Sequence, residues 1–112
     1  MGNQDLGKTS IGMQANVAAV LCYFLFFITG IIFYVLEKEN KFVRFHAMQS
    51  IVVFGFLWVL GAVLAFIPVI GWAVMPLVSV VTLILWVLLM IKAYQGEYFK
   101  LPVAGDIAEK NS

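Results

Sequence analysis

The chain has 112 residues, of which 63% are hydrophobic and 12% charged, and its mean hydropathy is +1.02. These values lie outside the range of soluble domains and predict a single integral membrane unit. Seven Lys and Arg against six Asp and Glu give a formal net charge of +1, which does not favour a nucleic-acid partner. One cysteine, Cys22, excludes an intramolecular disulfide and a cysteine-based metal site.

The hydropathy pattern predicts an all-α protein with three transmembrane helices. Residues 1–15 are polar and are interpreted as an arm or a short interfacial helix. Residues 17–36 carry no charge and are long enough to cross a hydrocarbon core of roughly 30 Å. Residues 37–46 form a charged loop, and the second span, residues 47–67, ends at Pro68. A tight, uncharged hairpin leads into the third span, residues 69–91, and residues 92–112 form a polar tail.

The distribution of Lys and Arg predicts the orientation. With three spans, the loop and the tail share one side of the membrane, and the opposite side has only Lys8 and the terminal amine. By the positive-inside rule the N-terminus is expected outside, with the loop and tail in the cytoplasm. The six cations on the cytoplasmic side are Lys38, Lys41, Arg44, Lys92, Lys100 and Lys110.

Polar residues cluster where the second span begins. His46, Gln49 and Ser50 stand at i, i+3 and i+4 and therefore share one helix face. With Arg44 they are interpreted either as satisfied polar residues of a packing face or as a site for a lipid phosphate or an acidic partner segment. The same stripe continues to Gly61 and Ala65, a small-residue pair that predicts close helix packing.

The sequence predicts a protein without enzymatic activity. It shows no nucleophile paired with a base and no glycine-rich phosphate loop, so no cofactor, metal site or small-molecule substrate is predicted. An enzyme with His46 as general base is a further hypothesis, for which no partner residue is visible.

Several segments resemble a known family. Asn16 with residues 21–23 (LCY), residues 37–50 (EKENKFVRFHAMQS), residues 67–72 (IPVIGW) and residues 92–110 are similar to the DUF4870 or Tic20-like proteins, which are small prokaryotic membrane proteins. The resemblance implies a prokaryotic plasma membrane and draws attention to residues 44–50 and 101–106 (LPVAGD). Tic20 belongs to a chloroplast protein-import machinery and has four membrane helices. It therefore suggests, as an alternative function, an oligomeric transport or translocation component.

The leading hypothesis is a non-enzymatic membrane protein whose cytoplasmic face docks a partner protein or anionic lipid headgroups. That face would combine residues 44–50 with residues 101–106, with Arg44 or Lys41 near Asp106 or Glu97. Three helices make a thin bundle, so self-association or a place in a larger membrane complex is also expected.

Overall fold

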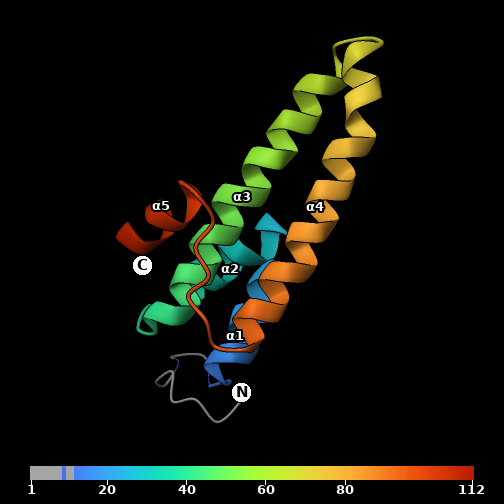
Figure 1. Cartoon of the computed structure of the whole chain (residues 1–112). Helices are drawn as coiled ribbons and strands as arrows, with labels where there is room; N and C mark the ends of the chain where they lie inside the picture. Colours follow the sequence, from blue (N-terminus) through green and yellow to red (C-terminus); the bar gives the residue numbers. More distant parts are fainter. Residues whose placement is uncertain (1–8, 10–11) are drawn as a thin grey trace.

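The computed structural model describes residue 9 and residues 12–112, and it is all-α, as predicted. Two long helices form a hairpin, and three shorter helices gather around its open end (Figure 1). The helices in the described part of the chain are α1 (Ala15–Phe24), α2 (Phe27–Leu36), α3 (Lys41–Ala65), α4 (Ile70–Tyr94) and α5 (Ala104–Lys110).

The long hairpin consists of α3 and α4, with 25 residues each. At 1.5 Å per residue each helix is about 37 Å long. Both are long and apolar enough to cross a membrane, and no Lys, Arg, Asp or Glu occurs between residues 45 and 91. The Asn40 side chain caps α3 by accepting a hydrogen bond from the Val43 N–H at 3.0 Å. The connection, residues 66–69, is short, in agreement with the predicted tight hairpin.

Three spans are not confirmed, because the first predicted span is two helices of ten residues. Leu25 and Phe26 separate them, and Phe26 has φ 58°. Helix α1 runs antiparallel to α4: the Asn16 amide donates to the Tyr94 carbonyl near one end, and the Trp86 indole donates to the Tyr23 carbonyl near the other.

Helix α2 then runs back along α3. The Phe27 ring lies 6.0 Å from the Trp58 ring, whereas further along α2 the Tyr34 ring lies under the Arg44 guanidinium at 4.1 Å. Residues 15–36 therefore run along the long hairpin from its open end, turn about half-way along it and run back to the open end. The start of α1 and the end of α2 both lie at the open end of the hairpin, where α4 ends.

The break between α1 and α2 is stabilised by side chains that replace the lost helical hydrogen bonds. The Thr29 hydroxyl accepts from the Leu25 N–H and donates to the Cys22 carbonyl, both at 3.1 Å. The Ser50 hydroxyl of α3 donates to the Phe26 carbonyl at 2.7 Å. Backbone groups in an apolar surrounding need such partners, so the break depends on these hydroxyls.

Helices α4 and α5 begin with the same turn. Residues 68–71 (PVIG) and 102–105 (PVAG) each place valine at φ 68°, with hydrogen bonds across the valine of 2.8 and 2.7 Å. This is the γ-turn with positive φ, which is rare and strained for a β-branched residue. In each case the helix starts directly after it, so one short motif reverses the chain at both places.

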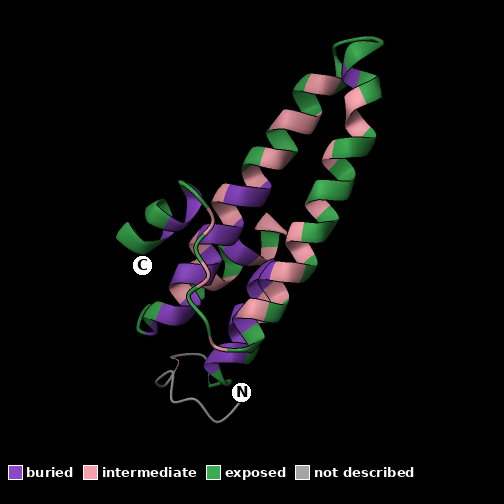
Figure 2. Cartoon of the chain, viewed as in Figure 1, coloured by how far each residue is buried: buried purple, intermediate pink, exposed green. Residues whose placement is uncertain are grey.

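Burial is concentrated at the open end of the hairpin (Figure 2). There α1, α2, α5 and the tail segment cover the first half of α3. Towards the turn no other helix lies beside α3 and α4, and large apolar side chains such as Val59, Val63, Leu77 and Leu83 are more than half exposed (Figure 2). The molecule is elongated, 49 × 24 × 21 Å, with a packed end and an apolar hairpin that projects from it.

Candidate functional site

The polar stripe predicted on one face of α3 lies inside the packed end. His46, Gln49 and Ser50 have no exposed surface. His46 Nε2 lies 2.9 Å from the Glu97 carbonyl, which only accepts, so Nε2 carries the proton. His46 Nδ1 therefore accepts the hydrogen bond of 2.7 Å from the Tyr23 hydroxyl.

The side chain of Gln49 binds backbone groups of the segment that follows α4. Its amide nitrogen donates to the Phe99 carbonyl at 2.9 Å and to the Tyr23 hydroxyl at 3.1 Å. Its amide oxygen accepts from the Leu101 N–H at 3.0 Å. Both halves of the side-chain amide are used, which fixes its orientation and holds residues 99–101 against α3.

Arg44 lies at the edge of the same cluster and joins three parts of the chain. Its guanidinium donates to the Tyr34 carbonyl at 3.1 Å and to the Glu37 carbonyl at 2.9 Å. It also donates to the Ser112 carbonyl at 3.4 Å, and the Tyr34 hydroxyl donates to the Asn111 carbonyl at 2.6 Å. Arg44 and Tyr34 thus connect the C-terminal residues to α2 and α3.

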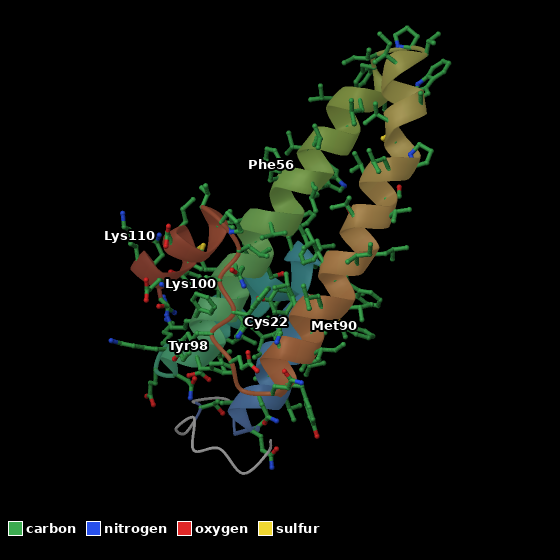
Figure 3. The ribbon with its side chains drawn as sticks, viewed as in Figure 1. Cys22, Phe56, Met90, Tyr98, Lys100 and Lys110 are labelled. Carbon is green, nitrogen blue, oxygen red and sulfur yellow. The ribbon has the colours of Figure 1, made fainter. Side chains whose placement is uncertain are left out.

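Aromatic rings enclose the cluster. The Phe42 and Phe45 rings lie 4.7 and 5.0 Å from the His46 ring, and Tyr98 packs on both phenylalanines. Figure 3 shows Tyr98 in the segment that crosses this part of α3. Desolvation raises the pKa of the Tyr98 phenol. Exclusion of water strengthens the enclosed hydrogen bonds and raises the cost of breaking them.

The two predicted segments meet, but not through the expected ion pairs. His46 and Gln49 bind the backbone of residues 97–101. After residue 91, Lys92 pairs with Glu97 at 3.5 Å and Lys100 pairs with Glu109 at 2.6 Å. The Glu109 carboxylate raises the pKa of the Lys100 ammonium. The expected pairing of Arg44 or Lys41 with Asp106 or Glu97 is not observed, and Asp106 lies on the exposed side of α5.

Gly61 and Ala65 do not form a close helix approach within the chain. A Cβ at Gly61 would have no heavy atom within 4 Å, and Ala65 is exposed. Close helix approach occurs instead at Gly30, where a Cβ would lie 2.8 Å from the Ser50 hydroxyl and 2.9 Å from the Ala47 carbonyl. A contact of Gly61 and Ala65 with another chain stays a prediction.

The buried cluster is satisfied within the chain. Among the described residues, no buried side-chain nitrogen or oxygen lacks a hydrogen-bond partner, and no group of three or more His, Cys, Asp or Glu is placed to hold a metal ion. Of the two interpretations of Arg44, His46 and Gln49, this geometry favours polar residues of a packing face. Sequence reasoning missed Tyr23, although a tyrosine in an uncharged run needs a partner for its hydroxyl.

Comparison with known proteins identifies the family. A model described as the magnetosome magnetite crystal formation protein family matches residues 8–108. A UPF0132 membrane protein of Methanocaldococcus jannaschii is 59% identical over 96% of each chain, and a second from that organism is 48% identical over 90% of this chain and 72% of its own. A UPF0132 membrane protein of Archaeoglobus fulgidus is 53% identical over 88% of this chain and 95% of its own. No solved structure matches.

These matches correct one prediction. The resemblance to DUF4870 or Tic20-like proteins is wrong, because the matching family model and the relatives carry neither description. The relatives are named membrane proteins, in agreement with the composition and with the two long apolar helices. The chain is a membrane protein and belongs to the magnetosome magnetite crystal formation protein family.

Proposed function

We propose that the protein is a non-enzymatic membrane protein that holds a folded C-terminal segment at one surface of the bilayer, where a partner protein docks on it. The observation that carries the proposal is the use of His46 and Gln49. Both are fully buried polar side chains of an apolar helix, and both bind the backbone of residues 97–101. Polar residues inside membrane helices are costly, and here they serve to fix the tail.

The same geometry changes which residues form the docking surface. Arg44, His46, Gln49 and Ser50 bind the chain itself, so they position the surface without contributing contacts to a partner. The charged residues of α5 are Asp106, Glu109 and Lys110, and all three are exposed beside Ile107. The two carboxylates and one ammonium favour a protein over anionic lipid headgroups, which attract clusters of Lys and Arg.

A concrete test is photo-crosslinking in native membranes from a photoreactive residue at Asp106, followed by mass spectrometry. We expect a discrete partner protein in the adducts. The same residue at Leu83, which is 55% exposed on α4, is the control and should give lipid adducts. Asp106 adducts that match those of Leu83 contradict the docking proposal.

The proposed topology has both described ends of the chain on the cytoplasmic side of a prokaryotic plasma membrane. All six cations from Lys38 to Lys110 lie outside the uncharged stretch of residues 45–91, and α1 and α2 return to the end where α4 ends. The positive-inside rule then places this end in the cytoplasm and the turn at residues 66–69 on the far side.

Cysteine labelling tests this topology. With an impermeant thiol reagent on intact cells, we expect Val69→Cys to be labelled, and Gln14→Cys and Ser112→Cys to be labelled only after lysis. The buried Cys22 gives little background. Labelling of Gln14→Cys in intact cells would restore the predicted orientation with the N-terminus outside.

A further inference from the structure

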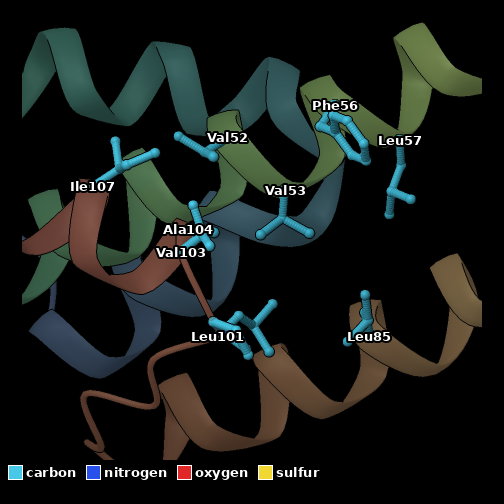
Figure 4. A pocket seen from close by; sticks show the side chains of 10 residues that line it. Val52, Val53, Phe56, Leu57, Leu85, Leu101, Val103, Ala104 and Ile107 are labelled. Atoms are coloured by element: carbon cyan, nitrogen blue, oxygen red, sulfur yellow. The ribbon is translucent and has the colours of Figure 1, made fainter.

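An apolar groove runs between the long hairpin and the tail (Figure 4). Val53 and Phe56 of α3 form one wall, Leu85 of α4 lies at the base, and Leu101 and Ile107 of the tail form the other wall. The groove has a volume of about 600 Å³, and every side chain that lines it is a hydrocarbon. It is separate from the buried polar cluster.

The tail wall of the groove is held in a defined position. The Leu101 N–H is bound by Gln49, and the γ-turn at Val103 directs the chain into α5. Ala104 is 8% exposed and α5 begins there. Because hydrogen bonds and a strained turn hold this wall in place, the groove has a defined shape in the fold.

We propose that the groove binds one hydrocarbon chain of a membrane lipid. Its rim continues into apolar surface at Phe56, which is 65% exposed, and Val103, which is 70% exposed. Phe56 belongs to α3, one of the two helices long enough to cross the bilayer, so the groove opens into lipid. Water would find no polar partner on its walls. The charged side chains of α5, Asp106 and Glu109, mark the level at which the lipid headgroup would lie.

The size of the groove favours a lipid chain over a helix from a second copy. A helix with side chains is about 10 Å across, so only one face of a second helix could enter an open groove of about 600 Å³. Such a contact would bury little of that helix. An extended hydrocarbon chain is thinner and follows the groove between α3 and the tail.

The test uses the full chain in nanodiscs that contain phosphatidylcholine with a diazirine near the end of one acyl chain. After photolysis, adducts are mapped to residues by mass spectrometry. We expect Val53 and Ala104, which are 7% and 8% exposed, to be labelled several-fold more than Leu89, which is apolar, 0% exposed and outside the groove. If Val53, Ala104 and Leu89 are all labelled at the same low level, the proposal is overturned.

Two variants separate the groove from general contact with lipid. Val52→Trp places a large ring in the groove and should reduce labelling of Ala104 several-fold, whereas Val63→Trp, on an exposed part of α3, should leave it unchanged. If Val52→Trp does not fold, Leu85→Phe fills the groove from α4. Equal labelling of Ala104 in the filled and control variants refutes the proposal. Loss of Ala104 labelling in discs that carry two copies of the chain also refutes it, because the groove would then bind a second chain.

Discussion

Replacement of Gln49 by leucine should release the tail from α3. The variant keeps a side chain of similar size but removes three hydrogen bonds, to Tyr23, Phe99 and Leu101. Two of the partners are backbone groups that then lie unsatisfied beside an apolar helix. Each such group costs about 1–3 kcal/mol, so the closed tail should lose about 2–6 kcal/mol.

The loss is measurable as hydrogen exchange of the tail amides in nanodiscs. Since about 1.4 kcal/mol corresponds to a factor of ten in an equilibrium constant, residues 99–110 should exchange roughly 30- to 20,000-fold faster in Gln49→Leu. Gln95→Leu is the matched control, because Gln95 is exposed and its side chain holds no part of the tail. Exchange that is the same in both variants would refute the inference that Gln49 fastens the tail.

Three further predictions concern glycines and turns. Gly30→Ala should lower the melting temperature in detergent, at a cost of about 1–3 kcal/mol, because the new Cβ would press on the Ser50 hydroxyl; Gly55→Ala, which meets no atom within 4 Å, should not lower it. Gly71→Ala should destabilise the protein to a similar extent, because the new Cβ would overlap the Leu64 carbonyl. Val69→Gly should be neutral or stabilising by about 1 kcal/mol, since glycine tolerates the positive φ at this position. Thermal unfolding of both variants checks these expectations. Gly61→Leu should abolish the proposed self-association in lipid, measured by inter-chain crosslinking, and unchanged crosslinking would exclude that contact.

The candidate site was predictable as a group of residues but not as a geometry. The i, i+3, i+4 spacing of His46, Gln49 and Ser50 correctly put them on one face of one helix. What that face meets could not be read from the spacing, because its partners are backbone atoms of residues 26 and 97–101 and the hydroxyl of Tyr23. Backbone acceptors are present in every residue, so they leave no mark in a sequence.

The sequence by itself determined the membrane class and the hairpin of α3 and α4. Hydropathy adds up residue by residue along a helix, and the uncharged turn around Pro68 needs no distant partner. Only the tertiary structure decided that residues 17–36 turn back at Leu25 and Phe26. This run is as apolar and as long as a spanning helix, and its break is stabilised by the Ser50 hydroxyl on another helix. The path of a segment in lipid depends on which neighbours satisfy its backbone, and those neighbours are brought together only by the fold.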